Sequence, residues 1–319
     1  MITAAAMSYD LVGDIHGCDR SLEKLLGRLG YIQADGVYRH PQRRVIFVGD
    51  FIDRGPGQRE VIGIVRPMIE SGAALSVMGN HEFNAIAWFT RHPHSDGFLR
   101  RHTARNRRQH EAFLQVYERH QGEYADVIDW FRTLPLWLDL GDLRVVHACW
   151  EIRWIDRIKQ DQCGSALLER SLLERSTGSE NWQYEAIETL LKGKEIPLRD
   201  GLSFNDKDGN SRRDIRVRWW DDRATTYQQA FLGPESARTH IPDDTIEGDH
   251  LVVYGHDQPP VFLGHYWMEG NPTPLATNIA CLDYSVAKPG GKLVAYRWDG
   301  EQFIDPAKYL WVSRVEPDR

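Results

Sequence analysis

A buried strand that ends in a carboxylate constrains the fold of this chain more than any other feature. Residues 45–48 read Val-Ile-Phe-Val and are followed by Gly49 and Asp50. A run of β-branched and aromatic residues predicts a buried strand, and the glycine marks where it becomes a loop. Open α/β sheets bind their ligands at the carboxyl ends of such strands. Asp50, with Asp53 and Arg54 close behind it, is therefore a candidate for metal and phosphate chemistry, although an Asp and an Arg after a strand are often only a loop salt bridge.

A second strand-and-loop unit precedes this one. Residues 9–12 predict a short strand that runs into a turn containing Asp14 and His16. Two residues apart in extended backbone, both side chains point to the same side. An oxygen and an imidazole ligand placed together suit a first-row divalent metal, whereas the stretch on its own would fit a surface turn. The leucines that follow predict an amphipathic helix over 21–29 that packs on a sheet.

A third unit repeats the arrangement. Residues 61–69 have a helix-like apolar face, and residues 73–78 predict the next strand. That strand ends in Gly-Asn-His-Glu at 79–82, so Asn80 and His81 also follow a strand end. Three β-α units that each deliver polar residues to one edge of a sheet are hard to explain by packing alone.

Residues from about 90 to 135 interrupt this rhythm and are predicted to form a helical insertion. The apolar residues at 113, 116 and 117 have helical spacing. The favoured interpretation is a charged and solvated helical surface, because charge runs usually are. The other interpretation is a basic lid over an anionic substrate, formed by Arg100, Arg101, Arg105, Arg107 and Arg108.

A hairpin after this insertion delivers one more candidate ligand. Residues 134–138 and 143–147 predict two strands around a Gly-Asp turn. The second strand ends in His147, so a fourth strand places a possible metal ligand at its end.

Residues 151–250 are polar and rich in Glu and Arg, and we expect them to form a second insertion. The neighbouring Trp219 and Trp220 could be a core edge or a stacking surface, and core is the favoured reading for a tryptophan pair. The other elements predicted here are two helices and a loop, over 166–175, 184–192 and 205–210.

The last part of the chain contains two strand-Gly-His patterns, and one of them can supply the final ligand. Residues 251–256 and 261–265 each read as an apolar run that ends in Gly-His, with a Pro-Pro pair between them. Because proline cannot donate ladder hydrogen bonds, one central strand cannot carry both His256 and His265. The strand pattern alone does not choose between the two. Closing β-structure is predicted over 278–284 and 290–298.

Composition limits the class of protein. A net charge of -7 over 319 residues argues against a general nucleic-acid binder, whose footprint is basic. The hydrophobic share of 41% is ordinary for a soluble globular protein. No segment is apolar for long enough to cross a bilayer, and the start lacks the basic flank and apolar region of a signal peptide. The four cysteines are far apart and fit free thiols in a reducing compartment. We therefore expect a cytoplasmic protein that binds neither nucleic acid nor membrane.

The strand-end groups together could hold two metal ions if one carboxylate bridges them. Two such ions about 3.5–4 Å apart can share a hydroxide nucleophile and clamp a phosphoryl group during in-line displacement. Any single histidine could be a core residue, but one structural rule places all six candidates. They are Asp14, His16, Asp50, Asn80, His147 and one late histidine.

These motifs, in this order, resemble those of the calcineurin-like metallophosphoesterases. The matching blocks are Asp-Ile-His-Gly at 14–17, Gly-Asp-Phe-Ile-Asp-Arg-Gly at 49–55, Gly-Asn-His-Glu at 79–82, His147 and a Gly-His. The Gly-His lacks the second histidine of the wider family, which points to the phosphoprotein phosphatase branch and its symmetrical diadenosine tetraphosphatases. The resemblance implies an α/β four-layer αββα sandwich. It would be a single domain over residues 1–319, with insertions at about 90–135 and 151–250.

The resemblance also implies roles for the site residues. One metal would be held by Asp14, His16 and Asp50, and the other by Asp50, Asn80, His147 and the late histidine. The two divalent ions would be Mn, Fe, Zn or Co, with Mn favoured. His265 is preferred to His256 because it lies nearer to the Leu-Asp pair at 282–283.

The catalytic groups are implied in the same way. Arg54 and Asn80 would bind the substrate, and His81 would protonate the leaving group. Asp53 would orient His81, and a His–carboxylate pair is a usual way to hold an imidazole for acid catalysis.

The expected function is hydrolysis of a dinucleoside polyphosphate, or of a similar small phosphate ester, by a metal-bound hydroxide. One alternative is a serine/threonine phosphoprotein phosphatase, but Val77 and Met78 stand where those enzymes carry Leu-Arg. Residues 282–293 resemble the ending of the dinucleotide hydrolases, except that Tyr284 and Ser285 replace Thr-Gly. A further alternative is a non-catalytic metal-binding scaffold, which would have no need of the catalytic groups.

Overall fold

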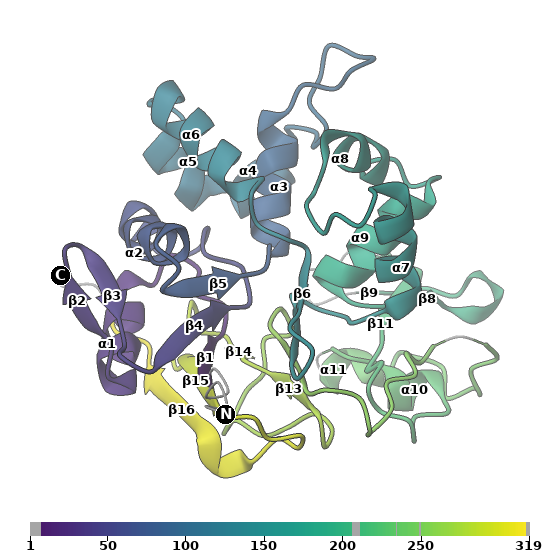
Figure 1. The fold of residues 1–319 in the computed structure, drawn as a ribbon. Coiled ribbons are helices and arrows are strands. Elements are labelled where there is room, and N and C mark those ends of the chain that lie inside the picture. Colours follow the sequence, from purple (N-terminus) through teal and green to yellow (C-terminus); the bar gives the residue numbers. More distant parts are fainter. Residues whose placement is uncertain (1–7, 206–210, 234, 249, 317–319) are drawn as a thin grey trace.

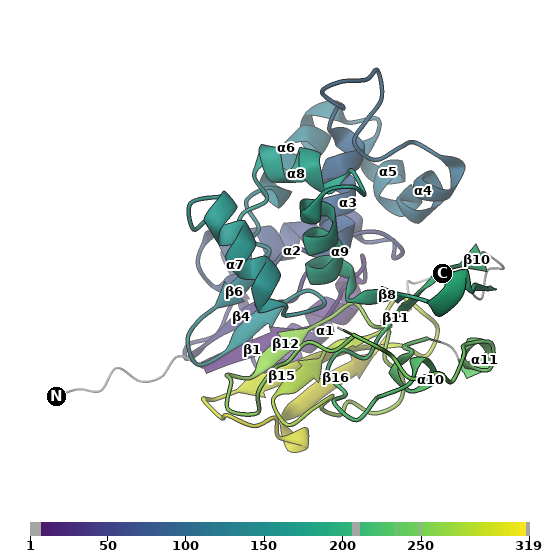
Figure 2. The same ribbon diagram turned by 90° about the vertical axis from the view of Figure 1, so that its right-hand side faces the viewer.

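The computed structural model describes residues 8–205, 211–233, 235–248 and 250–316. These residues form two main β-sheets with helices on their outer sides (Figures 1 and 2). Residues 206–210 of the loop predicted over 205–210 lie outside the described residues. Among the described helices, none is both long and apolar enough to cross a membrane.

The first sheet contains the strands that lead to Asp14, His16, Asp50 and Asn80. It consists of β1 (Ser8–Val12), β4 (Arg43–Phe47), β5 (Ala74–Ser76), β14 (Asp283–Tyr284), β15 (Lys292–Trp298) and β16 (Tyr309–Ser313). Strands β1, β4 and β5 run parallel, so their carboxyl ends meet at one edge. Strand β15 pairs antiparallel with β1, and both β14 and β16 pair with β15. The predicted strands over 9–12, 45–48 and 73–78 are confirmed within a few residues.

The second sheet contains the strands that lead to His147 and His265. It consists of β6 (Trp137–Asp139), β7 (Arg144–Val146), β12 (Val261–Leu263) and β13 (Ile279–Cys281). Strands β6 and β7 are antiparallel, which confirms the predicted hairpin. Strand β12 runs parallel to both β7 and β13. His147 directly follows β7 and His265 lies two residues after β12, so both reach the same end of this sheet.

The two sheets face each other across an apolar layer. Leu11 and Ile46 from the first sheet share this layer with Val145 and Phe262 from the second. Phe47, next in sequence to Ile46, instead joins the core on the other face of its sheet. Strand β4 is thus buried on both faces, which is why it reads as a continuous apolar run rather than an alternation.

Helices cover the outer sides of the two sheets. On the side of the first sheet lie α1 (Asp19–Leu29) and α2 (Gln58–Glu70), as predicted (Figure 1). On the other side, beside β6, lie α7 (Ile152–Asp161), α8 (Arg170–Ser176) and α9 (Trp182–Lys192). The backbone N–H of Ala148 donates to the carbonyl of Leu190 at 2.9 Å and joins the end of β7 to α9. The order helix, sheet, sheet, helix confirms the predicted αββα architecture.

The first insertion is helical, as predicted. Its region contains α3 (Asn80–Phe89), α4 (Ala104–Gln109), α5 (Glu111–Tyr117) and α6 (Gln121–Phe131). Arg100 bonds to Gln109 at 2.8 Å, and Arg107 forms an ion pair with Glu118 at 2.7 Å. Two of the five arginines of the proposed lid thus have partners inside the insertion, which suits the solvated helical surface. The lid itself stays a prediction.

The second insertion differs from its prediction in two helices. Helix α7 was not predicted, and the helix predicted over 166–175 begins only at Arg170 because Leu167 bridges Pro135 in a short antiparallel contact. Trp219 is buried, as a core residue should be. The insertion also contains β8 (Glu195–Pro197), η1 (Arg199–Gly201), β9 (Phe204–Asn205), β10 (Ser211–Arg212), β11 (Asp214–Arg216), α10 (Tyr227–Ala230) and α11 (Glu235–Arg238). Elsewhere the described chain forms β2 (Ile32–Ala34), β3 (Val37–Arg39) and η2 (Pro306–Lys308).

The strand-like segment at 251–256 is not a strand. Its backbone pairs with neither main sheet, and the Tyr254 hydroxyl instead donates to the carbonyl of Pro259 at 2.6 Å. The segment therefore folds back toward the Pro-Pro pair instead of extending along β12. An apolar run alone could not distinguish this loop from a buried strand.

The layer between the sheets should dominate the stability of the fold. Phe262 is fully buried there, with its ring centroid 5.0 Å from that of Tyr296. We predict that Phe262→Ala lowers the free energy of unfolding by about 3–5 kcal/mol, because it leaves a cavity that the sheets cannot close. Denaturant unfolding measures this, with Phe303→Ala as the matched control. Phe303 is 57% exposed, so its loss should cost less than about 0.5 kcal/mol. Equal losses in the two variants would contradict this account of the core.

Candidate active site

All six residues predicted as metal ligands meet at one end of the two sheets. Asp14, Asp50 and Asn80 follow the parallel strands β1, β4 and β5, and the second sheet supplies His147 and His265. All but His265 are more than nine-tenths buried. The rule that parallel strand ends share one edge therefore placed these side chains correctly. Their role as ligands stays a prediction.

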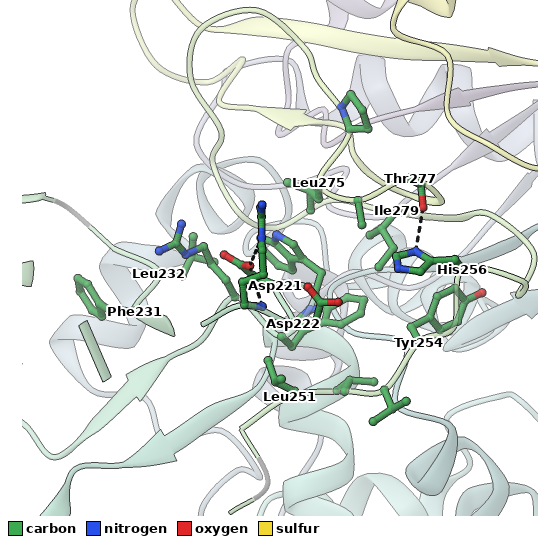
Figure 3. A pocket seen from close by; sticks show the side chains of 18 of the residues that line it. Asp221, Asp222, Phe231, Leu232, Leu251, Tyr254, His256, Leu275, Thr277 and Ile279 are labelled. Carbon is green, nitrogen blue, oxygen red and sulfur yellow. Dashed lines mark hydrogen bonds and ion pairs between the residues drawn. The ribbon is translucent and has the colours of Figure 1, made fainter. Parts of the chain in front are cut away.

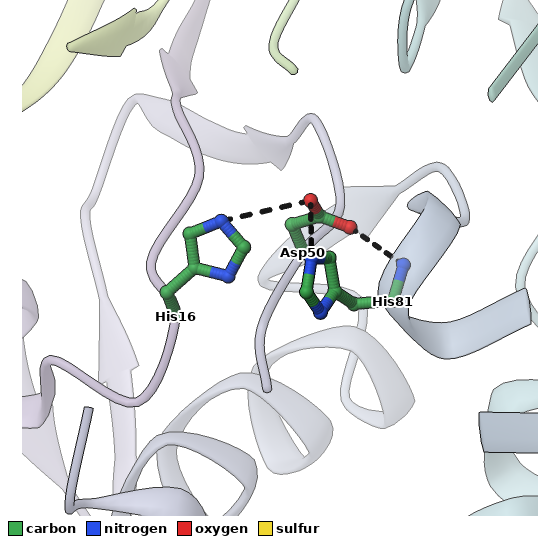
Figure 4. Close-up of side chains that lie close together, drawn as sticks. All are labelled: His16, Asp50 and His81. Carbon is green, nitrogen blue, oxygen red and sulfur yellow. Dashed lines mark hydrogen bonds and ion pairs between the residues drawn. The ribbon is translucent and has the colours of Figure 1, made fainter. Parts of the chain in front are cut away.

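Asp50 stands at the centre of the cluster. Its Oδ2 lies 3.3 Å from His147 Nε2, 3.7 Å from His16 Nε2 and 3.9 Å from His81 Nε2. Its other oxygen, Oδ1, accepts a hydrogen bond from the backbone N–H of His81 at 2.9 Å. Figure 4 shows the imidazoles of His16 and His81 on two sides of this carboxylate. One carboxylate oxygen thus faces nitrogens that come from three separate segments.

Two groups of ligand atoms share Asp50. The first is His16, Asp50 and His81, the second is Asp50, His147 and His265, and in each the atoms lie within 4.8 Å of one another. Asn80 belongs to the second group as well, because its Oδ1 is 3.2 Å from His147 Nε2 and 2.8 Å from His265 Nδ1.

Asp14 joins the first group. Its Oδ2 lies 4.0 Å from His16 Nε2 and accepts from the backbone N–H of His265 at 3.0 Å. The two groups therefore have the composition of the two predicted ligand sets, except that His81 also lies close to the first.

The donor atoms fit divalent cations. His16 Nδ1 contacts the carbonyl of Ile52 at 3.0 Å and His147 Nδ1 that of Val48 at 2.7 Å, so both Nε2 atoms face the cluster. Among the buried side-chain atoms that find no hydrogen-bond partner in the described part of the chain, three belong to this cluster: Asp14 Oδ1, His16 Nε2 and His265 Nε2. A buried polar atom left unpaired costs about 1–3 kcal/mol, and cations coordinated here would remove that cost.

The titration behaviour of the cluster points the same way. Burial and the nearby Asp283 raise the pKa of Asp14 well above its usual value. Burial and the neighbouring His81 lower the pKa of His16 to about 3. Burial alone would lower the pKa of His147, but the carboxylate of Asp50 outweighs it and raises that pKa to about 10. Metal ligands must be deprotonated to bind a cation. Bound cations would therefore compete with protons for Asp14 and His147.

Beside the cluster, His81 and Asp53 form the predicted pair. His81 Nδ1 lies 2.6 Å from Asp53 Oδ2, and an Arg54 nitrogen lies 3.4 Å from His81 Nε2. Burial would lower the pKa of His81, but Asp50 and Asp53 outweigh it and raise that pKa. Burial would likewise raise the pKa of Asp53, but the adjacent His110 and His81 lower it. Distance alone would allow His81 Nε2 either to bind a metal or to carry a proton.

The loops hold several of these residues in strained backbone. The φ angles are 48° at His16, 55° at Asp50, 68° at Asp53, 69° at Arg54 and 70° at His265. Residues other than glycine rarely adopt positive φ, and such residues gather at functional sites where the surroundings fix them. The backbone N–H of Asp53, for example, donates to Gln58 Oε1 at 2.8 Å.

Two residues of the site were assigned no role from the sequence. Glu82 accepts three backbone hydrogen bonds of 2.9–3.0 Å, from Asp50, Phe51 and Gly79. Its position as third residue of α3, as in a capping box, was a signal that could have found it. His110 Nδ1 lies 2.9 Å from Asp53 Oδ1, a contact that depends on how the insertion folds back and that no sequence spacing could indicate.

His256 lies outside this cluster. It is exposed, and its Nδ1 is 3.0 Å from Thr277 Oγ1 (Figure 3). It lines a separate open pocket of about 900 Å³ together with Trp220 and Tyr254. Of the two Gly-His patterns, the structure thus brings only that of His265 to the strand ends.

Comparisons with known proteins agree with this geometry. The family model described as calcineurin-like phosphoesterase matches residues 7–272. Bis(5'-nucleosyl)-tetraphosphatase PrpE [asymmetrical] of Halalkalibacterium halodurans is 46% identical over 76 residues, which is 24% of this chain and 31% of that protein. The protein of the same name from Bacillus subtilis is also 46% identical over 76 residues, with the same coverage. The chain thus spans about a third of the length of these curated relatives.

A solved structure supports the fold alone. The serine/threonine phosphatase of Saccharomyces cerevisiae with similarity to human phosphatase PP5 is 15% identical, with a TM-score of 0.53. The alignment covers 99% of this chain and 82% of that one. Since the family model matches most of the sequence, and the site has the residues that the resemblance predicted, the protein belongs to the calcineurin-like phosphoesterases.

Proposed function

We propose that the protein hydrolyses a dinucleoside polyphosphate, using two divalent metal ions, with Mn favoured. The observation that carries this proposal is the shared carboxylate of Asp50, within 3.9 Å of three imidazoles, beside the buried His81–Asp53 pair. The tetraphosphatases that match part of the chain support the substrate class. The well separated cysteines, all free, support a cytoplasmic location.

The metal ions would occupy the two ligand groups. Asp14, His16 and Asp50 would hold one ion, and Asp50, Asn80, His147 and His265 the other. When bound, such ions polarise a phosphoryl oxygen and activate water as a nucleophile. The protein contributes a buried arrangement of donors that needs little rearrangement to bind them.

The remaining groups would handle the phosphate and the proton. Arg54 would bind phosphate oxygens, with Asn80 beside it, and His81 would hold a proton at Nε2 for the leaving oxygen. Arg54 lies 3.4 Å from that nitrogen, so the acid and the phosphate-binding guanidinium face the same space. Asp53 would fix the imidazole through Nδ1 at 2.6 Å. This arrangement favours an acid over a third ligand at His81.

A pair of cations around one tryptophan favours a substrate with several phosphates. Trp267 lies two residues after His265, and its ring centroid is 3.8 Å from Arg54 Cζ and 4.0 Å from Lys288 Nζ. The backbone N–H of Trp267 donates to Asp283 Oδ2 at 2.8 Å, which ties the main chain at Trp267 to β14. A second positive charge at the same ring as Arg54 suits a polyphosphate better than a single phosphorylated side chain.

The alternatives have less support. Likeness to the yeast phosphatase concerns the fold alone, so it does not favour a phosphoprotein substrate. A metal-binding scaffold would not require the buried His81–Asp53 pair. Assay of the purified protein with manganese against diadenosine tetraphosphate, a phosphopeptide and nitrophenyl phosphate tests the proposal.

We predict the highest kcat/KM on diadenosine tetraphosphate among these three substrates. Chromatography of the products then shows the position of cleavage, since symmetrical cleavage gives only ADP and asymmetrical cleavage gives ATP and AMP. Preference for the phosphopeptide would support the protein phosphatase instead. No hydrolysis of any substrate, by a protein loaded with metal, would support the scaffold.

We predict that Asp50→Asn empties both metal sites, whereas Asp14→Asn empties mainly one. Only Asp50 belongs to both ligand groups, so only its replacement removes a ligand from each. Elemental analysis of the metal content per chain, with turnover measured on the same samples, checks this. An Asp50→Asn enzyme with full metal content and normal turnover would exclude the bridging role.

We predict that Lys288→Gln raises KM for diadenosine tetraphosphate about 10-fold or more and leaves nitrophenyl phosphate unchanged. Hydrogen bonds to charged groups contribute about 1.5–3 kcal/mol, and a single phosphate would be held by Arg54 alone. Lys292→Gln is the matched control, because its ammonium bonds to the carbonyl of Gly270 at 2.6 Å and lies near Trp311. Equal changes in the two lysine variants would show that Lys288 has no special contact with the polyphosphate.

A further inference from the structure

The carboxylate of Asp53 is shared between two imidazoles from different parts of the chain. Its Oδ2 lies 2.6 Å from His81 Nδ1, and its Oδ1 lies 2.9 Å from His110 Nδ1. All three side chains are buried. Each oxygen of the carboxylate therefore has its own nitrogen partner, on opposite sides of the group.

His110 comes from the helical insertion and is held rigidly. It lies at the junction where α4 ends and α5 begins. Its ring stacks on Phe113 with centroids 4.8 Å apart and an interplanar angle of 20°. The ring of Trp88 also packs against it, with centroids 6.0 Å apart and an interplanar angle of 61°. Packing against these two aromatic rings fixes the direction in which Nδ1 points.

The chemistry of the contact defines the state of the ring. Nδ1 faces a carboxylate oxygen, so Nδ1 carries the proton and donates it. Nε2 is buried and finds no hydrogen-bond partner among the described residues. In the Nδ1–H tautomer, Nε2 has a lone pair and no proton. A proton on Nε2 would be a buried donor without an acceptor, which costs free energy.

A carboxylate held at one oxygen only could turn about its side-chain bonds. With both oxygens bonded, the plane of the Asp53 carboxylate is fixed, and with it the orientation of His81. Loss of the second partner would also leave a buried charged oxygen unpaired.

We propose that His110 is a positioning residue that fixes Asp53 and thereby orients His81 toward the leaving group. The inference rests on the acid role proposed for His81, but not on the identity of the substrate. The first insertion would then take part in the reaction indirectly, because its His110 holds Asp53 and Asp53 holds His81.

Two aryl phosphates of almost the same shape test this. Phenyl phosphate has a poor leaving group and nitrophenyl phosphate a good one that needs little protonation. We expect His110→Leu to lower kcat on phenyl phosphate about 10-fold, as loss of an orienting partner usually does, with KM little changed and a smaller loss on nitrophenyl phosphate. His110→Asn should recover most of the loss, because its amide N–H can take the place of Nδ1–H.

Comparison with other variants separates positioning from general damage. Adding His110→Leu to His81→Asn should cause no further loss, because both act through one proton donor. His102→Leu is the matched control. His102 belongs to the same insertion and stacks on Trp88, with ring centroids 3.7 Å apart, but it does not contact Asp53. Equal losses on the two esters, no recovery in His110→Asn, or additive losses in the double variant would overturn the proposal.

A measurement without catalysis makes the test independent of the proposed function. Besides the imidazole N–H protons of His16 and His147, which face backbone carbonyls, nuclear magnetic resonance of the ¹⁵N-histidine-labelled full chain should resolve two that are bonded to the Asp53 carboxylate, from His81 and His110. His81→Asn should remove one of them. His110→Leu, or His110→Asn if the former does not fold, should remove the other and shift that of His81. An unchanged His81 signal would overturn the proposal, even if the protein hydrolyses neither ester.

Discussion

The carboxylate of Glu82 ties together the two loops on which the rest of the site depends. It accepts backbone hydrogen bonds from Asp50 and Phe51 after β4 and from Gly79 before α3. Burial, reinforced by the charge of Asp50, raises the pKa of Glu82 to about 7, although the N–H donors oppose this. These hydrogen bonds offset part of the cost of burying Glu82, and they hold Asp50 at a φ of 55°. Gly79 is equally constrained, since an added Cβ would lie 2.2 Å from Asp50 Oδ1.

This fixed loop explains how one oxygen of Asp50 can face several imidazoles. The surrounding histidines are directed inward by carbonyls that belong to the same loops: His147 by Val48, and His16 by Ile52. The ligand atoms are therefore oriented by backbone, before any cation binds. An arrangement that is rigid and unpaired without cations is suited to capturing them, because little conformational entropy is lost on binding.

The sequence was informative wherever a local rule also governed the tertiary structure. Parallel strands share an edge, so Asp14, Asp50 and Asn80 could be brought together without knowledge of any contact. The sequence was uninformative where tertiary contacts decide. The apolar run at 251–256 pairs with neither main sheet, so its pattern predicted a strand that is absent. Helix α7 was missed for another reason: its buried Trp154, Ile155 and Ile158 have helical spacing, but they lie in a segment interpreted as a polar insertion. His110 could not be linked to Asp53, 57 residues away in sequence, because no spacing encodes how the insertion folds back.

The two insertions perform comparable tasks at opposite sides of the site. The first holds Asp53 through His110. The second, with Trp219, holds the residue next to His265: Trp219 Nε1 donates to the Tyr266 hydroxyl at 3.0 Å, and that hydroxyl donates to the carbonyl of Ala148 at 3.0 Å. Asp53 and His265 are also residues with strained backbone, at φ of 68° and 70°. The strand ends thus bring the candidate ligands together, and the insertions add contacts to the loops that carry Asp53 and His265. Segments whose sequence gives little sign of function are in this way coupled to the reactive groups.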